Sequence, residues 1–303
     1  MGEVRMAAKT VAIMSTGDMG HNVAKVLKKE GLRVVTCLAG RSERTRGLAA
    51  AAAVEELASV EEVVAAADLV LSILPPGNAL DNARDVAAAM KMVGSFAHFA
   101  DCNAVSPQTA KHVAEVLTGA GAPFSDAGIV GPGPGTREKP TRFYISGPDI
   151  GALDILAGPS IELMNMGPRI GDASAVKMCY AAVTKGTWTL HTAALVAAEA
   201  LGVTDAVHDE LTFSRPNEYA VMEQMVPRMP LDAARWIGEM HEISATLEGT
   251  GVTPNFHKGA ADIFELLVKT PIAEETRETV DKSRTLKQAL KIYAAHLPGG
   301  GKG

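Results

Sequence analysis

Short apolar runs alternate with helical segments along the first half of the chain. Continuous apolar runs that end in glycine, proline or polar residues are typical of strands buried in a parallel sheet. Such runs occupy residues 10–14, 32–38, 68–74 and 96–100, and two more begin at residues 124 and 141. The segments between the early runs have helical character, beginning with residues 21–30. This alternation predicts an α/β domain with a parallel sheet.

The pattern changes at residue 171, after which helical periodicity dominates. Residues 171–202 contain no proline and a single interior glycine, Gly186, and they predict one helix roughly 45 Å long. Shorter helical segments follow at residues 203–214, 217–226, 232–250 and 256–268. We therefore expect two domains, an α/β domain over residues 1–170 and an all-α domain over residues 171–297, joined by the long helix. Residues 298–303 are rich in glycine and predict a disordered tail.

Composition and charge exclude several classes of partner. The 303 residues have a net charge of -6, so we expect neither a nucleic-acid partner nor binding to an anionic membrane. No stretch approaches the roughly 20 apolar residues of a membrane span, and Glu3 and Arg5 leave no apolar core for a signal peptide. The three cysteines lie far apart without a CxxC spacing, which indicates reduced thiols in a cytoplasmic protein. His241 and His257 have no partners at metal-ligand spacing, so no metal site is expected.

The turn between the first strand and the first helix indicates a dinucleotide site. It consists of Ser15, Thr16, Gly17, Asp18, Met19 and Gly20. Its spacing follows G-x-G-x-x-G with Ser15 in the first position; Gly17 would let the backbone approach a pyrophosphate, and Gly20 would let helix and strand pack closely. A purely structural glycine turn is the alternative. In its strand-turn-helix context the turn predicts a Rossmann-type dinucleotide-binding domain.

The residues after the second strand favour NADP(H) over NAD(H). An NAD site normally has an acidic residue here that binds the ribose 2′-hydroxyl, whereas arginine suits the 2′-phosphate of NADP. Arg41, Ser42 and Arg44 occupy this loop. Glu43, the acidic residue nearest to them, stands between the arginines and is a poor acceptor for the 2′-hydroxyl. Solvated loop arginines are the alternative interpretation.

Later loops are expected to meet the same crevice, because ligands of a parallel sheet bind beyond the carboxyl ends of its strands. Leu74 ends the third apolar run, Pro75 and Pro76 follow it, and Asn103 follows the fourth. We assign these residues to the cofactor site, and we expect the proline-glycine loop that begins at Gly131 to converge on the same crevice.

Four motifs together resemble the β-hydroxyacid dehydrogenase superfamily. They are Ser-Thr-Gly-Asp-Met-Gly at 15–20, Ile-Leu-Pro-Pro at 73–76, Asp-Cys-Asn-Ala-Val-Ser-Pro at 101–107 and Gly-Asp-Ala-Ser-Ala-Val-Lys-Met-Cys-Tyr at 171–180. The superfamily includes 3-hydroxyisobutyrate dehydrogenases and 6-phosphogluconate dehydrogenase, and imine reductases share its fold. The second half, with Arg-Trp-Ile-Gly-Glu-Met at 235–240, resembles the helical C-terminal region of 6-phosphogluconate dehydrogenase. The resemblance covers essentially the whole chain and implies an NAD(P)-dependent dehydrogenase that forms a homodimer.

The resemblance also implies that Lys177 is the catalytic lysine, although several substrate positions differ from the family pattern. Ala181 replaces the asparagine that the family places one turn after the lysine, and Tyr180 lies beside it. The serine and threonine of the Asp-x-Ser-Thr motif are replaced by Asn103 and Ala104. The Ser-Gly-Gly substrate loop reads Val130, Gly131 and Pro132. We expect the reaction type to be retained and the usual small hydroxy-carboxylate substrate to differ.

Lys177 has the chemistry that hydride transfer requires. Transfer of hydride to or from a nicotinamide leaves an oxygen that needs a proton partner, and partial desolvation lowers the pKa of a lysine toward the working range. A lysine that points to water is the alternative, but a cation near a helix start is disfavoured by the macrodipole and needs a specific reason. Tyr180 is a second candidate for proton transfer, or else a core tyrosine. The substrate candidates are Asn103, Val130, Gly131, Pro132, Thr184, Trp236, Glu239 and Met240, and for Trp236 and Met240 core packing is the alternative.

Two classes of function follow. The first is an NADP(H)-dependent oxidoreductase acting on a hydroxyl or carbonyl group, such as that of a β-hydroxy acid, with imine reduction as the alternative within the enzyme class. The second is a catalytically decayed nucleotide-binding sensor, which the changes at Asn103, Val130 and Ala181 permit and the intact Lys177 opposes.

Overall fold

The computed structural model describes residues 9–299, and the predictions for the first eight residues and for residues 300–303 lie outside this range. The chain forms two compact units, residues 1–178 and residues 179–303. The division falls inside helix α6, Asp172–Ala200. The bounds of α6 confirm the predicted helix over residues 171–202. The domain boundary that we place between residues 170 and 171, at the start of this helix, stays a proposal.

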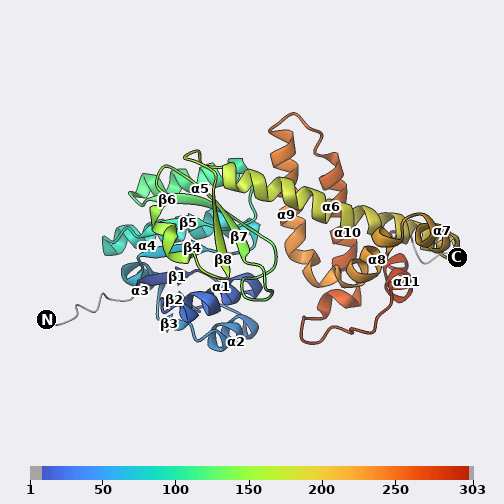
Figure 1. Cartoon of the computed structure of the whole chain (residues 1–303), viewed down its shortest axis with the longest axis horizontal. Helices are drawn as coiled ribbons and strands as arrows, with labels where there is room; N and C mark the ends of the chain where they lie inside the picture. Colours follow the sequence, from blue (N-terminus) through green and yellow to red (C-terminus); the bar gives the residue numbers. More distant parts are fainter. Residues whose placement is uncertain (1–8, 300–303) are drawn as a thin grey trace. The chain divides into compact units, whose positions relative to one another are not determined.

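The first unit is built on one eight-stranded sheet with the order β3-β2-β1-β4-β5-β6-β7-β8 (Figure 1). The strands are β1 Thr10–Ile13, β2 Arg33–Cys37, β3 Glu55–Leu57, β4 Leu69–Ser72, β5 His98–Asp101, β6 Phe124–Val130, β7 Thr141–Ser146 and β8 Ile161–Asn165. All neighbouring pairs from β3 to β6 are parallel, β7 runs antiparallel to β6, and β8 is parallel to β7. The order from β3 to β6 is that of a doubly wound nucleotide-binding sheet. The strands β3 and β8 were not expected from the sequence.

Helices cover both faces of this sheet and bury separate apolar layers. They are α1 Asp18–Lys29, α2 Glu43–Ala51, α3 Val60–Ala66, α4 Ala79–Val93 and α5 Pro107–Ala120. Side chains of α3, α4 and α5 pack with Phe99 and Phe124 on one face. Side chains of α1 and of the 3-10 helix η2, Gly151–Leu156, pack with Ile13 and Phe143 on the other. Continuous apolar strands are explained by this two-sided burial.

The second unit is entirely helical among its described residues. After α6 come α7 Thr204–Ser214, α8 Pro216–Met225, α9 Pro230–Glu248, α10 Asn255–Val268 and α11 Leu286–Ala295. Helices α9 and α10 pack side by side (Figure 1), and α11 contributes Tyr293, whose buried hydroxyl donates to the Val226 carbonyl at 2.9 Å. The sequence did not predict α11. Within residues 9–299, none of the helices is long and apolar enough to cross a membrane.

Candidate functional site

The glycine turn is shaped for close approach of a phosphate group. An added Cβ at Gly20 would lie 2.0 Å from the Ser15 carbonyl oxygen, so only glycine lets α1 start this close to β1. A Cβ at Gly17 would meet nothing within 4 Å, which leaves open space in front of the turn. The amino end of α1 has no side-chain cap, whereas Ser42, Ser59 and Ser106 cap α2, α3 and α5. The uncapped N–H groups and the helix dipole suit an anion such as a pyrophosphate.

The arginines after β2 lie beside this turn. Arg41 donates from Nη2 to the Met14 carbonyl at 3.1 Å. Arg44 Nη2 lies 2.6 Å from Asp18 Oδ1, in the first turn of α1. Ser42 is used as a helix cap, because its Oγ accepts from the Thr45 N–H at 3.3 Å. The residues predicted for the 2′-phosphate and those predicted for the pyrophosphate are therefore neighbours in space.

Asn103 links the loops that follow β4 and β5. Its Oδ1 accepts from the Leu74 N–H at 2.5 Å, and its Nδ2 donates to Ser72 Oγ at 2.8 Å and to Asp101 Oδ1. Its side chain is nearly fully buried. Asn103 therefore fixes the Leu74-Pro75 segment at the carboxyl end of the sheet, where the 3-10 helix η1, Pro76–Asn78, begins.

The proline-glycine loop after β6 folds back on α1. Gly131 has a left-handed backbone, with φ of +108°, and Thr141 Oγ1 donates to the Pro132 carbonyl at 2.7 Å. A Cβ at Gly133 would lie 2.7 Å from Nδ2 of Asn22, on α1. The loop thus brings Val130, Gly131 and Pro132 to the side of the sheet that carries the glycine turn.

The start of α6, which carries Lys177, is capped by two strands of the sheet. Asp126 of β6 accepts through Oδ2 from the N–H groups of Gly171 and Ser174, both at 3.0 Å, and through Oδ1 from Ser174 Oγ at 2.6 Å. Ser146 of β7 donates from Oγ to Asp126 Oδ2 at 3.1 Å and accepts from the Ala173 N–H at 3.1 Å. We call Asp126 and Ser146 the α6 cap. It satisfies N–H groups that a helix start leaves free, and it places a negative charge at the positive end of the dipole.

Lys177 lies one turn beyond this cap, against the end of β6. A Cβ at Gly128 would be 2.7 Å from the Ala173 carbonyl oxygen and 3.0 Å from Cβ of Lys177, so the glycine allows α6 to pack directly on the strand. Lys177 Nζ donates to the Ile129 carbonyl at 2.8 Å. This contact directs the ammonium group toward the carboxyl end of β6, beside the loop that starts at Gly131.

Two buried carboxyl groups lie beneath this helix start. Asp101 and Asp126 are register partners on β5 and β6, and at most 1% of either residue is exposed. Burial, and after it the negative charge of Asp126, raise the pKa of Asp101 to about 7 against the opposing hydrogen bonds from Asn103 and the positive charge of Lys177. Burial also raises the pKa of Asp126, against the hydrogen bonds that it accepts. The sequence prediction named neither residue, although a carboxylate inside an apolar strand is a usable signal of function.

The predicted site residues of the helical unit differ in exposure. Tyr180 is half-exposed, with 50% of its surface accessible. Thr184 Oγ1 donates to the Tyr180 carbonyl at 3.1 Å. Trp236 packs against Trp188 and Phe264, with ring centroids 5.8 and 5.3 Å apart. Met240 is fully buried, so this packing agrees with the core interpretation of Trp236 and Met240.

Glu239 already has a strong partner in the helical unit. Its Oε1 lies 2.6 Å from Nζ of Lys185, with side-chain exposures of only 5% and 17%. The Lys185 ammonium also lies 5.5 Å from the centre of the Trp236 ring. A substrate contact to Glu239 would have to compete with this buried ion pair, and the substrate role of Glu239 stays a prediction.

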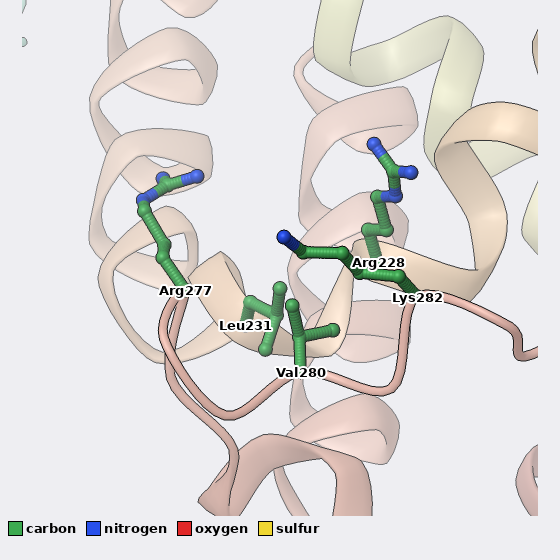
Figure 2. A pocket seen from close by; sticks show the side chains of 5 residues that line it. All are labelled: Arg228, Leu231, Arg277, Val280 and Lys282. Atoms are coloured by element: carbon green, nitrogen blue, oxygen red, sulfur yellow. The ribbon is translucent and has the colours of Figure 1, made fainter.

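A hollow of about 200 Å³ lies in the helical unit, and none of the predicted site residues lines it. It is lined by Arg228, Leu231, Arg277, Val280 and Lys282. Figure 2 shows the two apolar side chains between the basic ones. Among residues 9–299, no group of three or more His, Cys, Asp or Glu side chains is placed to hold a metal ion.

Two family models match this chain. Residues 10–153 match the model described as the NAD binding domain of 6-phosphogluconate dehydrogenase. Residues 198–267 match a model described as a domain of unknown function (DUF1932). The first match covers the glycine turn, the arginine loop and Asn103, and the second covers Trp236 and Glu239.

Solved structures are similar over most of the chain. One is the conserved protein MTH1747, which is of unknown function and is described as structurally similar to 3-hydroxyacid dehydrogenases. It is 28% identical to this chain, the match covers 85% of this chain and 96% of that chain, and the TM-score is 0.61. The 3-hydroxyisobutyrate dehydrogenase of Mycobacterium tuberculosis, with L-serine, is 23% identical, with coverage of 94% and 98% and a TM-score of 0.65. An imine reductase of Streptomyces aurantiacus is 17% identical, with coverage of 93% and 99% and a TM-score of 0.53. The last two similarities show the fold alone, and together with the nucleotide-binding model they confirm the predicted class: a Rossmann-like domain followed by a helical domain.

Proposed function

Because the chain belongs to the β-hydroxyacid dehydrogenase superfamily, we propose that it transfers hydride between NADP(H) and a hydroxyl or carbonyl substrate, with Lys177 as general acid and base. The protein is an NAD(P)-dependent dehydrogenase or reductase; the nucleotide preference, the substrate and the role of the lysine are what we propose. The observation that carries the proposal is the placement of Lys177 Nζ, 2.8 Å from the Ile129 carbonyl at the end of β6.

The glycine turn, with its uncapped helix start and the open space before Gly17, fits the pyrophosphate of a dinucleotide. We assign the cofactor contacts to Ser15, Thr16, Gly17, Asp18, Met19, Gly20, Arg41, Ser42, Arg44, Leu74, Pro75, Pro76 and Asn103. A bound nicotinamide nucleotide supplies the hydride in reduction and accepts it in oxidation.

Lys177 handles the proton that accompanies the hydride. In reduction its ammonium donates a proton to the substrate oxygen while the carbonyl carbon becomes the C–H carbon of an alcohol. In oxidation the neutral amine takes the hydroxyl proton and becomes an ammonium, and solvent restores the starting state in either direction. The hydrogen bond to the Ile129 carbonyl orients the amine and favours its protonated form.

The preference for NADP(H) rests on Arg41 and Arg44, which lie beside the glycine turn. A guanidinium binds a phosphate with paired, charge-assisted hydrogen bonds. We expect Arg41→Ala to raise the Kd for NADPH about tenfold, a loss of about 1.4 kcal/mol, with little change for NADH. Equal losses for both nucleotides would contradict a 2′-phosphate contact.

Turnover tests the role of Lys177. The absorbance of NADPH is followed with a panel of aldehydes, keto acids and cyclic imines, for the wild type, Lys177→Ala and the control Lys111→Ala, whose lysine is exposed on α5. Loss of a general acid and base should lower kcat roughly a hundred- to ten-thousand-fold, with NADPH binding retained. Undiminished turnover in Lys177→Ala would refute the mechanism.

The same panel separates the alternatives. Turnover of cyclic imines alone would identify an imine reductase, a reaction of structural relatives that share the fold. Tight NADPH binding without turnover of any substrate would favour a nucleotide-binding sensor. Tyr180 as a second proton donor, and the substrate roles of Asn103, Val130, Gly131, Pro132, Thr184, Trp236, Glu239 and Met240, depend on the substrate that the panel identifies.

We also propose a homodimer in the cytoplasm. Val183 and Leu190 lie seven residues apart, on one face of α6, and are 69% and 67% exposed. Leu201 and Phe213 are 76% and 86% exposed. Apolar side chains in such numbers on one helical unit suit burial against a second copy. Sedimentation velocity at micromolar concentration would show a dimer, and a monomer there would contradict the proposal.

A further inference from the structure

The carboxyl groups of Asp101 and Asp126 form a buried pair on one face of the sheet. They are register partners on parallel neighbouring strands, so their side chains point to the same side. This is also the side of Gly128, two residues after Asp126, on which the first turns of α6 pack. The pair therefore lies under the helix start that carries Lys177.

The two carboxyl groups differ in the hydrogen bonds that they accept. Asp126 accepts hydrogen bonds on both oxygens from Ser146, Gly171 and Ser174. Asp101 accepts only on Oδ1, from the N–H and the side-chain amide of Asn103. Its Oδ2 is buried and has no hydrogen-bond partner within residues 9–299. An ionised, unpartnered oxygen is costly in this setting, so Asp126 is the member that holds the negative charge and Asp101 the member that holds a proton.

The charges that face Asp101 come from two packed elements. Asp126 on β6 is negative, and Lys177 on α6 is positive. Cys102, the next residue in the chain, has a thiol whose pKa is raised by burial, so it stays neutral, and Asn103 carries no charge. Lys177 is therefore the cation whose proton affinity responds to a change in the charge of Asp101.

We propose that Asp101 is a positioning residue for proton transfer: its buried carboxyl holds a proton beneath Lys177, and loss of that proton sets the pH at which Lys177 gives up its own. When Asp101 is protonated, Lys177 has less negative charge beneath it and releases its proton more readily. When Asp101 ionises, the new negative charge stabilises the ammonium. The inference rests on the proposed function in that the proton on Lys177 is the one used in turnover.

Linkage makes the effect reciprocal. If an ionised Asp101 retains the proton on Lys177, then the positive charge of Lys177 promotes the ionisation of Asp101 by the same free energy. The positive charge of Lys177 opposes the rise in the pKa of Asp101, as this linkage requires. Two variants, one at each residue, therefore measure the same interaction independently.

The test measures the titration of Lys177 without turnover. Full-length protein is labelled with trace acetic anhydride across a pH series, and acetylation of Lys177 is read by peptide mass spectrometry in the wild type, Asp101→Asn and Asp85→Asn. Asp85 is exposed on α4, so its variant makes the same substitution outside the buried pair. We expect the labelling midpoint of Lys177 to fall by about one pH unit in Asp101→Asn and to stay in place in Asp85→Asn. An unchanged midpoint in a folded Asp101→Asn protein would overturn the proposal.

The reciprocal measurement uses Lys177→Met, whose side chain is neutral and of similar length. The carboxyl carbon of Asp101, followed by carbon-13 NMR, should then titrate about one pH unit higher than in the wild type. An unshifted titration would overturn the proposal even where Asp101→Asn fails to fold. Because neither readout needs a substrate, absence of turnover with every substrate would defeat the proposed function, while the coupling between Asp101 and Lys177 would still be measured.

Discussion

Replacement of Asp126 tests whether the α6 cap holds the helix start that carries Lys177. In Asp126→Ala the N–H groups of Gly171 and Ser174 and the Ser174 hydroxyl lose an acceptor at 2.6–3.0 Å. A buried donor left without a partner costs about 1–3 kcal/mol, and neighbouring losses are not additive, so we expect a total of about 3–5 kcal/mol. Asp126→Asn keeps an acceptor oxygen and lets the Ser174 hydroxyl turn to accept, so its expected cost is only about 1–2 kcal/mol.

Urea unfolding followed by circular dichroism measures these differences, and hydrogen exchange of residues 171–178 shows whether the helix start opens locally. Asp172→Ala is the matched control, because Asp172 lies in the same first turn but pairs with Arg169 near the surface. Surface pairs contribute about 0–1 kcal/mol. The reasoning fails if Asp126→Ala and Asp172→Ala are equally mild, or if the amides of residues 171–178 exchange at the wild-type rate in Asp126→Ala.

Three further changes have defined outcomes. Gly20→Ala puts a Cβ 2.0 Å from the Ser15 carbonyl oxygen, so the turn must open and calorimetric NADPH affinity should fall at least about tenfold. Glu239→Ala leaves the Lys185 ammonium without its buried partner at 2.6 Å, and we expect a loss of about 3–5 kcal/mol in unfolding experiments. For Asp101, the pKa rises from an ordinary 3.8 to about 7 on folding, so the unfolded chain releases this proton first as the pH rises. Stability should therefore fall between these values, by roughly 4 kcal/mol at 1.36 kcal/mol per pH unit, and Asp101→Asn should abolish the fall.

Each of these has its own control. Gly47→Ala, in helix α2, meets nothing within 4 Å and should leave nucleotide affinity unchanged. Asp205→Ala removes the acid of an exposed pair with Lys287 and should cost at most about 1 kcal/mol. For Asp101, urea midpoints are compared at about pH 5 and about pH 8; a wild type as stable at the higher pH as at the lower one would show that the carboxyl is ionised throughout.

The predicted elements follow from how much of each segment is buried. The long helix and the central strands were found because they have continuous helical or apolar character. Strand β3 reads Glu-Glu-Leu at the edge of the sheet, and β8 is a largely exposed edge strand, so neither has the apolar character by which a buried strand is recognised. Helix α11 follows a long irregular segment after η4, Pro271–Glu274, and it was not predicted although one of its faces is buried.

The parts of the candidate site that the sequence predicts are those encoded by local patterns. The glycine turn and the arginine loop are local patterns, and the structure brings them together. The α6 cap joins Asp126 to Gly171 and Ser174, residues 45 and 48 positions away, and a contact of that separation leaves no local pattern. Asp101 and Asp126 do interrupt apolar strands, which was the available sign that both are paired in the fold.

The groups that place Lys177 are distinct from those predicted to touch the substrate. Asp126, Ser146 and Gly128 fix the first turns of α6 through contacts with the sheet, whereas Val130 and Ala181 occupy positions at which the sequence is expected to depart from the family pattern. A mutation at the second set can change which molecule fits without displacing the amine. Such a separation would make the scaffold tolerant of substrate change over evolutionary time, because residues of the predicted substrate loop can be replaced one at a time while Lys177 keeps its place.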